Sequence, residues 1–342
     1  MARLIAATAV GPKEIDEAKT RLLAGDVVVI PTETVYGLAA AISSEEGLKK
    51  IFSLKERPFF DPLIVHISSF KEAASVVKEW PPLADFIARF FWPGPLTLVL
   101  PKADHIHPLI TSGLETVAIR YPNHPIAQKL IQVVGSPLAA PSANKFGKTS
   151  PSCATHARNE FPDRSLLILD GGPCEIGIES TVISFGKNSS GHDELLILRP
   201  GGITEEMLQS ALERWSHPVT MRRAVSSESP GHMKHHYMPV IPLVILKKDE
   251  PIGLSESTKN RIKEDLQIED FSNIGYLDLS DEPALAARHL YSQLREISDS
   301  GAKFIVVRKN PDQIKDGLWQ AIWDRLSRAA SLDLSTPPEP GQ

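Results

Sequence analysis

The chain has 342 residues, of which 42% are hydrophobic and 23% charged, and its formal net charge is −5. This length exceeds one comfortable hydrophobic core, so two domains are expected. The acidic balance argues against a protein that grips nucleic acid mainly through phosphates, and no apolar run approaches the ~20 residues that span a bilayer. The two cysteines, Cys153 and Cys174, form no CxxC. A disulfide framework and a thiolate zinc site are therefore not expected, and a reducing cytoplasm is favoured. The apolar N-terminal stretch is too short to favour a signal peptide.

Helix and strand patterns alternate through the first two thirds of the chain. Pro12 begins a helix that Gly25 ends, and Ser44 caps the next one. Further helices are predicted at 83–91 and 125–134 and after Thr204; strands are predicted at 27–30, 63–65, 96–100, 117–119, 138–140, 166–169, 181–185 and 195–198. This mixed order predicts one α/β domain with a twisted mixed sheet and flanking helices over residues 1–215.

The last third of the chain has a cleaner alternation. Periodicity is lost over residues 216–240, which are predicted to be an interdomain linker. Strands are then predicted at 243–246, 274–279 and 304–307, and helices at 255–266, 283–298 and 317–330. This βαβαβα order predicts a smaller Rossmann-like domain at 241–334, with a parallel sheet and right-handed crossovers. The Pro-rich tail at 335–342 is expected to be disordered.

Residues 31–38, Pro-Thr-Glu-Thr-Val-Tyr-Gly-Leu, directly follow a predicted buried strand. Thr32, Thr34 and Tyr36 alternate, so an extended segment aims their hydroxyls to one side. Ligands bind at strand ends in open α/β sheets. The alternative is a solvated loop with an incidental tyrosine.

Two cations precede a rigid turn at Pro58, and a histidine ends the next strand. Lys55 and Arg57 offer a point charge and a bidentate fork for phosphates. Alternatively, they complement the dipole at a helix C-terminus. His66 ends an apolar strand, and a core histidine bonded to backbone is the competing interpretation.

The loop at 141–150 resembles a Walker A motif, with Ser142 where the first glycine belongs. A phosphate-binding loop of that kind must open a helix, but Pro151 follows Ser150 here. A true P-loop is therefore rejected. The hydroxyl and amide groups of Ser142, Asn144 and Ser150 remain nucleotide-binding candidates.

The predicted linker contains His232, His235 and His236, the first and last at helical spacing. HExxH and nearby carboxylate or thiolate ligands are absent from the sequence, so no dedicated zinc site is expected. No GxGxxG follows a strand and no GxSxG elbow occurs, which weakens dinucleotide-binding and hydrolase interpretations. The glycine turn at 170–172 and the turn at 198–201 are each compatible with plain structure.

The order of the motifs is more specific than any one of them. After 31–38 come Lys-x-Arg-Pro with Pro-Leu-Ile-Val-His (55–66), Trp-Pro-Gly-Pro-Leu-Thr (92–97), Val-Ala-Ile-Arg-Tyr-Pro (117–122), Ala-Pro-Ser-Ala-Asn (140–144), Glu-Ser-Thr-Val (179–182) and Leu-Arg-Pro-Gly (198–201). This series resembles the YrdC-like threonylcarbamoyl-AMP synthases. The linker sequence at 230–239 and the following α/β domain resemble the longer, two-domain branch.

The resemblance implies an L-threonylcarbamoyladenylate synthase that serves tRNA modification. Its substrates are L-threonine, bicarbonate and ATP, and its products are threonylcarbamoyl-AMP and pyrophosphate. Positioning and charge neutralisation are expected to dominate its catalysis. Mg²⁺ is expected to accompany ATP, held by phosphates and water rather than by the protein, and no organic cofactor is expected. The product is expected to pass to a tRNA-modifying transferase complex, with tRNA binding weak or indirect and no membrane involved.

The resemblance also implies roles for individual residues. Those for L-threonine are Thr34, His66, Arg120, Ala140 (through its backbone) and Ser180, with Arg120 suited to the carboxylate. Those for the nucleotide are Lys55, Arg57, Asp61, Thr116, Ser142, Asn144, Ser150, Arg199 and Tyr237. Lys55 and Arg57 are the catalytic candidates. Tyr237 is expected to reach back from the linker over the site, which makes the linker a lid.

The sequence departs from the family pattern at three places. Asp61 stands where many members have Asn, and beside phosphates it needs a cation or a turned-away rotamer. His232 is an extra linker residue and makes the register of Tyr237 less defined. Residues 185–192 form a hairpin excursion before Arg199.

Two other function classes compete with the synthase. One is a non-catalytic RNA-binding, translation-associated module, which the acidic balance disfavours. The other is a carbamoyl-transfer maturation domain, which usually accompanies acylphosphatase or zinc-finger segments that this sequence lacks.

Overall fold

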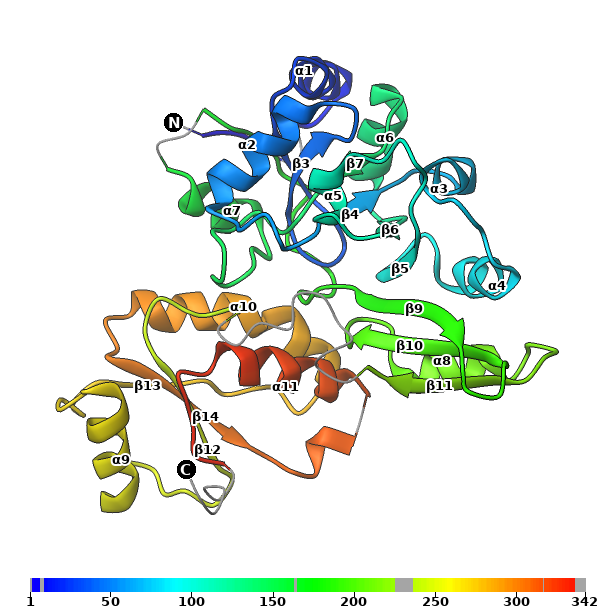
Figure 1. Ribbon diagram of the computed structural model, residues 1–342. Helices are drawn as coiled ribbons and strands as arrows, with labels where there is room; N and C mark the ends of the chain where they lie inside the picture. The colour runs from blue at the N-terminus through cyan, green and yellow to red at the C-terminus, as the bar shows by residue number, and fades with distance from the viewer. Residues whose placement is uncertain (1, 7–8, 163–164, 225–235, 316, 336–342) are drawn as a thin grey trace. The chain divides into compact units, whose positions relative to one another are not determined.

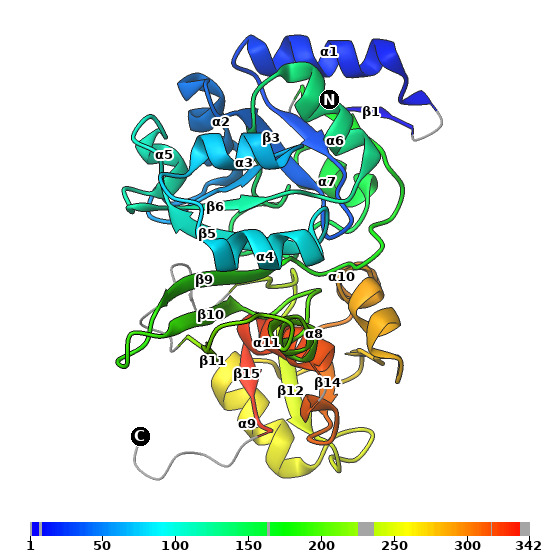
Figure 2. The same ribbon diagram turned by 90° about the vertical axis from the view of Figure 1, so that its right-hand side faces the viewer.

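The computed structural model describes residues 2–6, 9–162, 165–224, 236–315 and 317–335. The chain divides into two compact units (Figures 1 and 2). The first unit comprises Met1–Phe146 and Ser150–His232, and the second comprises Gly147–Thr149 and Met233–Gln342. The linker residues His232 and His235 and the tail at 336–342 lie outside the described residues, so the expectations for them stay untested.

The first unit is built on one mixed sheet, which has eleven strands among the described residues. In spatial order they are β1 (Arg3–Ile5), β8 (Leu167–Leu169), β2 (Val28–Ile30), β3 (Gly37–Ala41), β7 (Leu138–Ala139), β4 (Ile64–His66), β6 (Thr116–Arg120), β5 (Leu96–Pro101), β9 (Thr181–Lys187), β10 (Asp193–Arg199) and β11 (Val219–Arg223). Parallel pairs such as β4 with β6 alternate with antiparallel pairs such as β5 with β6. The predicted mixed α/β sheet is confirmed.

Helices cover the sheet of the first unit. They are α1 (Pro12–Leu23), α2 (Glu45–Lys55), α3 (Phe70–Val76), α4 (Pro82–Phe91), α5 (Pro108–Thr111), α6 (Pro125–Val134), α7 (Ala154–Glu160) and α8 (Glu205–Leu212). Val28 of β2 joins a core cluster with Leu22 of α1 and Leu130 of α6. Its neighbour Val29 joins the other cluster, with Leu48 of α2. Because successive strand residues point to opposite faces, both faces of the sheet are buried at β2, which is a continuous β-branched run.

The hairpin excursion predicted at 185–192 is confirmed, since β9 and β10 pair antiparallel with Lys187 opposite Asp193. The stretch from Ser216, expected to be a linker, begins differently. Residues 219–223 form β11, which pairs in parallel with β10. The alternating exposure of Val219–Arg223 offers one half-buried face, too short a pattern to mark a strand in the sequence.

The second unit contains a parallel sheet, with four strands among the described residues, in the order β13 (Ile274–Tyr276), β14 (Phe304–Lys309), β12 (Leu243–Lys247) and β15 (Leu332–Asp333). Its helices are α9 (Glu256–Leu266), α10 (Pro283–Asp299), the 3₁₀ helix η3 (Gln313–Lys315) and α11 (Gly317–Ala329). The predicted smaller parallel domain is confirmed. In the part of the chain that the structure describes, no helix is long and apolar enough to cross a membrane.

Candidate functional site

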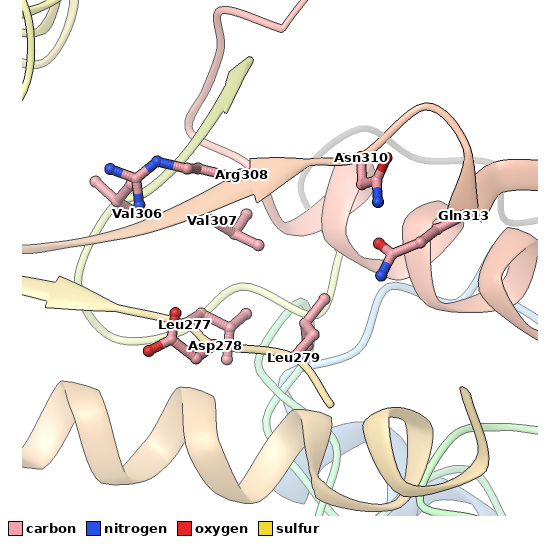
Figure 3. A pocket seen from close by; sticks show the side chains of 8 residues that line it. All are labelled: Leu277, Asp278, Leu279, Val306, Val307, Arg308, Asn310 and Gln313. Carbon is pink, nitrogen blue, oxygen red and sulfur yellow. The ribbon is translucent and has the colours of Figure 1, made fainter. Parts of the chain in front are cut away.

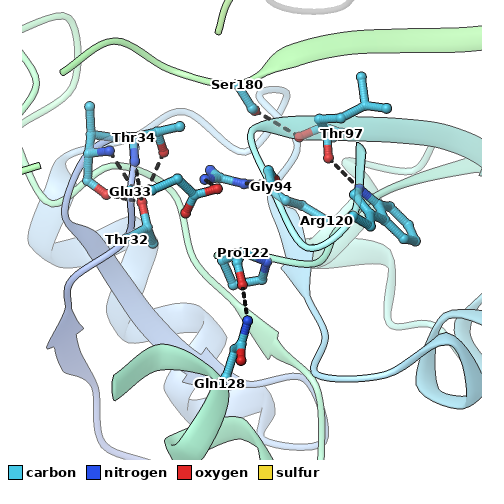
Figure 4. Close-up of polar contacts among 12 residues, drawn as sticks. Thr32, Glu33, Thr34, Gly94, Thr97, Arg120, Pro122, Gln128 and Ser180 are labelled. Carbon is cyan, nitrogen blue, oxygen red and sulfur yellow. Dashed lines mark hydrogen bonds and ion pairs between the residues drawn. The ribbon is translucent and has the colours of Figure 1, made fainter. Parts of the chain in front are cut away.

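Neighbouring strands bring three of the predicted threonine residues to one place. β4 and β6 run parallel with His66 paired to Arg120, each the last residue of its strand. On the other side of β6, Thr97 of β5 pairs with Arg120. The Thr97 hydroxyl lies 2.8 Å from the hydroxyl of Ser180, the residue before β9. His66, Arg120 and Ser180, which are far apart in the sequence, therefore lie at the same end of neighbouring interior strands. Thr97 neighbours both Arg120 and Ser180 (Figure 4).

The segment at 31–38 turns before it enters β3. Thr32 Oγ1 accepts hydrogen bonds from the backbone N–H groups of Thr34 and Val35, each at 3.2 Å. It also lies 2.9 Å from the Thr34 hydroxyl, so these two hydroxyls share one side, as predicted (Figure 4). Backbone bonds from Tyr36 to Pro151 and from Leu38 to Pro141 hold the segment against the 141–151 loop. Thr34 is fully buried at this junction.

Tyr36 departs from the expected alternation. Its hydroxyl contacts Asp170 Oδ1 at 3.1 Å and Gly172 O at 2.7 Å, and it accepts a bond from Gly171 N. Burial raises the pKa of Tyr36, so the phenol stays protonated. A Cβ on Gly171 would lie 2.5 Å from the ring of His124, so only glycine fits this turn. Tyr36 thus anchors the 170–172 turn instead of joining the two threonines.

Between the two threonines, Glu33 makes the contact that the sequence analysis missed. Its carboxylate lies 2.8 Å from Nη2 of Arg120, and the two side chains are 3% and 4% exposed (Figure 4). Arg120 Nε donates to Gly94 O at 3.4 Å, and the Glu33 carbonyl accepts from Ile176 N at 2.9 Å. The available indication was a carboxylate placed among small hydroxyl residues after a buried strand, with no adjacent cation in the sequence.

His66 and Ala140 share one hydrogen-bond partner, the carbonyl of Ile64 in β4. His66 Nδ1 lies 3.1 Å from Ile64 O, and Ala140 N donates to the same carbonyl at 3.0 Å. Burial, helped by the nearby charge of Arg120, lowers the pKa of His66 to about 3. The imidazole is therefore neutral at physiological pH, and the backbone bond expected of a core histidine is present. Neither feature prevents the ring from contacting a ligand.

Lys55 joins the end of α2 to the 141–151 loop. The side chain is 1% exposed, and Nζ donates to Ser142 O and to Asn144 O, each at 2.5 Å. Burial, followed by the neighbouring charge of Arg57, holds the pKa of Lys55 well below its usual value. Lys55 therefore shapes the loop that carries two predicted nucleotide residues.

Arg57 and Asp61 form an ion pair, with Nη2 2.8 Å from Oδ2. Arg57 also donates to the carbonyls of Asp61 and Pro62, at 3.0 and 2.8 Å. The sequence required a cation or a turned-away rotamer for Asp61, and Arg57 is that cation. The pair holds the turn at Pro58–Pro62, with both side chains only about a tenth exposed.

Two of the remaining nucleotide candidates, Ser150 and Arg199, contact residues 179–180, whereas Thr116 lies at the other end of β6 from Arg120. Ser150 donates to the buried carboxylate of Glu179 at 2.6 Å, and Arg199 donates to Ser180 O at 3.0 Å and to its hydroxyl at 3.1 Å. These contacts connect the nucleotide candidates to the threonine candidate Ser180. Thr116 differs, because it begins β6 whereas Arg120 ends it.

Tyr237 belongs to the second unit and is buried there, 3% exposed. Its ring stacks on Tyr291 with centroids 6.0 Å apart, and the guanidinium of Arg325 lies 5.7 Å from its centroid. Its carbonyl accepts from the Thr149 hydroxyl at 3.3 Å. The proposed nucleotide role of Tyr237 stays a prediction.

The second unit also has a cavity of about 190 Å³ at the carboxyl ends of β13 and β14 (Figure 3). Its lining comprises Leu277, Asp278, Leu279, Val306, Val307, Arg308, Asn310 and Gln313. Arg308, the cation in this lining, is engaged by backbone, since it donates to Glu250 O and Pro251 O. No residue predicted from the sequence lies in it.

Comparisons with known proteins agree with this arrangement. Residues 20–201 match the profile of the Sua5, YciO and YrdC family, described as telomere recombination. Residues 203–331 match the profile described as the threonylcarbamoyl-AMP synthase C-terminal domain. Threonylcarbamoyl-AMP synthases of Pyrococcus abyssi and Bacillus subtilis are each 37% identical to the chain, covering 93% of it and 96% and 93% of themselves. The crystal structure of Pyrococcus abyssi Sua5 complexed with L-threonine superposes with a TM-score of 0.80 at 33% identity, covering 98% of this chain and 99% of that one.

Proposed function

The chain belongs to the Sua5, YciO and YrdC family and carries the threonylcarbamoyl-AMP synthase C-terminal domain, and from this we propose that it is an L-threonylcarbamoyladenylate synthase. The enzyme makes threonylcarbamoyl-AMP and pyrophosphate from L-threonine, bicarbonate and ATP. One observation carries the assignment to this site: the register of β4 and β6 pairs His66 with Arg120 beside the threonine-rich turn that follows β2. These strand ends supply a cation for a carboxylate and hydroxyls for a small polar amino acid.

Threonine recognition is proposed for the strand-end residues. Arg120 receives the carboxylate, because a guanidinium offers a planar fork of donors. Thr34, His66, Ser180 and the backbone of Ala140 surround the rest of the amino acid. Support comes from their burial, which lets each polar contact act in a medium of low dielectric constant.

Nucleotide binding is proposed for a second set of residues. They are Lys55, Arg57, Asp61, Thr116, Ser142, Asn144, Ser150, Arg199 and Tyr237. Lys55 supports the 141–151 loop through two carbonyls, and Arg57 adds positive charge at the Pro58 turn. Arg199 contacts Ser180, so phosphate binding at this arginine directly affects a residue proposed to bind threonine.

The reaction needs two bond-forming steps. Threonine's neutral amine attacks the carbon of bicarbonate, and water leaves, giving a carbamate. A carbamate oxygen then attacks the α-phosphorus of ATP, the bond to the β-phosphate oxygen breaks, and pyrophosphate leaves. The protein contributes orientation and charge neutralisation to these steps.

Mg²⁺ is proposed to accompany ATP, with phosphate oxygens and water as its main ligands. Among the described residues no cluster of three or more His, Cys, Asp or Glu side chains could cage a metal ion. The carboxylate of Asp61 is engaged by Arg57. Such an ion would supply charge neutralisation for the phosphates.

Beyond the reaction itself, we propose that the protein works in the cytoplasm and that a transferase complex attaches the product to tRNA. The net charge of −5 supports weak or indirect tRNA binding by this chain, because phosphate contacts favour basic surfaces.

One assay tests the function. Purified full-length protein is incubated with ATP, Mg²⁺ and bicarbonate, with and without L-threonine, and pyrophosphate is measured. We expect release that requires threonine, with threonylcarbamoyl-AMP detected by mass spectrometry. Release that is independent of threonine contradicts the synthase. No release contradicts it as well and leaves the non-catalytic RNA-binding alternative.

A further inference from the structure

The Glu33 side chain is buried with unused hydrogen-bonding capacity. Neither of its carboxylate oxygens accepts a hydrogen bond from any described residue, and Nη2 of Arg120 donates none. The two groups meet at 2.8 Å as an ion pair, without hydrogen-bond geometry. A buried carboxylate in this condition is costly and calls for an explanation, because it has lost its water and gained few donors.

The groups around Glu33 leave Arg120 as its principal countercharge. His124, between β6 and α6, and Cys174, after β8, both interact electrostatically with Glu33. Burial lowers the pKa of His124, and burial raises the pKa of Cys174. Both are therefore uncharged at neutral pH. His66, across the β4–β6 pair, faces Arg120 and is likewise neutral.

Threonine fits this pair of charges because it is a zwitterion. Its ammonium and carboxylate groups are attached to one carbon, so a protein group beside the arginine that binds the carboxylate can also reach the ammonium. The Glu33 carboxylate touches the guanidinium that receives the carboxylate under the proposed function. Its two free acceptors match the N–H donors of an ammonium group.

We propose that Glu33 binds the α-ammonium group of threonine and accepts one of its protons. This role rests on the proposed synthase function. The N–H bond breaks, its electron pair stays on nitrogen, and the proton forms an O–H bond on Glu33. The neutral amine then attacks bicarbonate, and carbamate and water form. Glu33 returns the proton to solvent before the next turnover.

Threonine binding exchanges the partners of Glu33 and Arg120. The threonine carboxylate pairs with the guanidinium of Arg120, and the ammonium group pairs with Glu33. The Glu33–Arg120 pair is thus replaced by two pairs, one at each end of the amino acid.

The test is the pH dependence of the Glu33→Gln variant at saturating ATP and bicarbonate. Loss of a general base costs about 10²- to 10⁴-fold in kcat at pH 7. As the pH rises toward the pKa of free threonine's ammonium group, solvent supplies the neutral amine and the loss shrinks by about tenfold per pH unit. A variant within threefold of wild type at pH 7, or a loss that is equal at every pH, overturns the proposal.

Two controls separate this role from structural damage and from the function itself. Glu175→Gln removes an exposed carboxylate nearby and should leave the profile unchanged. The second control uses wild-type protein and therefore needs no variant. It measures the affinity for the threonine analogue that has a hydroxyl in place of the ammonium group. We expect it to bind at least 100-fold more weakly than threonine, on the order of a lost charged contact, and equal affinity overturns the proposal. If wild-type protein makes no pyrophosphate with threonine, the synthase function fails and this role falls with it. If wild type is active and Glu33→Gln behaves like wild type, only the role of Glu33 fails.

Discussion

The carboxylate of Glu33 lies 2.8 Å from the guanidinium of Arg120, and both side chains are almost fully buried. The pair joins the turn after β2 to the end of β6, so it couples two walls of the proposed threonine site. A buried pair of this kind is weak as a source of stability, because both ions have lost their hydration. Breaking it from one side is costly, and that asymmetry makes it experimentally accessible.

Arg120→Ala should destabilise the protein and weaken its use of threonine. The substitution leaves the Glu33 charge buried without a partner, which costs about 3–5 kcal/mol of unfolding free energy. It also removes the proposed partner of the threonine carboxylate, which should weaken threonine binding at least about 30-fold. Urea unfolding and a threonine titration of pyrophosphate release measure the two effects. An unchanged apparent affinity for threonine contradicts the role.

The double variant Arg120→Ala/Glu33→Gln separates the two effects. Neutralising Glu33 should restore most of the lost stability without restoring threonine use, since no buried charge remains. Arg89→Ala is the matched control, because Arg89 pairs with Asp85 on an exposed helix surface. The substitution should change the free energy of unfolding little.

The sequence predicts elements well where local pattern and burial agree. β2 was readable because Val28–Ile30 is continuously β-branched and buried on both faces. β3 was not predicted, because Gly37–Ala41 is rich in glycine and alanine, which have low strand propensity. β3 forms because its backbone pairs with β2 on one side and β7 on the other, and a single-sequence pattern carries no such information.

The candidate site divides in the same way. Family motifs identify Arg120 and Thr34, but they do not say which groups those residues meet. Glu33 meets Arg120 only after the sheet order has brought the β2 turn to the end of β6. The sequence favoured a hydroxyl-only interpretation of residues 31–38, because alternation predicts faces and not partners.

Lys55→Met should destabilise the first unit and weaken ATP binding. The ammonium donates to the carbonyls of Ser142 and Asn144, and methionine leaves both without that donor. Hydrogen bonds to a charged group contribute about 1.5–3 kcal/mol each, so a loss of about 3 kcal/mol is expected. Lys49→Met, on the exposed face of the same helix, should change stability little. Equal effects of the two substitutions in urea unfolding and ATP titration would rule out the loop-anchoring role.

His66→Gln should flatten the acid side of the stability profile. The pKa of His66 in the folded protein is about 3, against 6.5 for the unperturbed group. Above pH 6.5 the ring is neutral in both states and contributes no pH dependence. Below it the unfolded chain takes up a proton that the folded chain cannot, so stability falls by about 1.4 kcal/mol per pH unit. Urea unfolding at several pH values from about 7.5 to 5 measures the slopes. Equal slopes in wild type and variant contradict the buried neutral state, and exposed His105→Gln is the control.

Gly201→Ala should damage the site through Ser180. A Cβ at this position would lie 2.4 Å from both Ser180 C and Thr181 N, both backbone atoms, so the turn after β10 must move. Overpacking of this kind costs about 1–3 kcal/mol, and the displaced backbone carries the carbonyl that Arg199 contacts. We expect higher KM values for both threonine and ATP, with folding retained. Gly186→Ala is the matched control, because a Cβ there meets nothing within 4 Å. A Gly201→Ala enzyme with wild-type KM values would show that Arg199 and Ser180 do not act together.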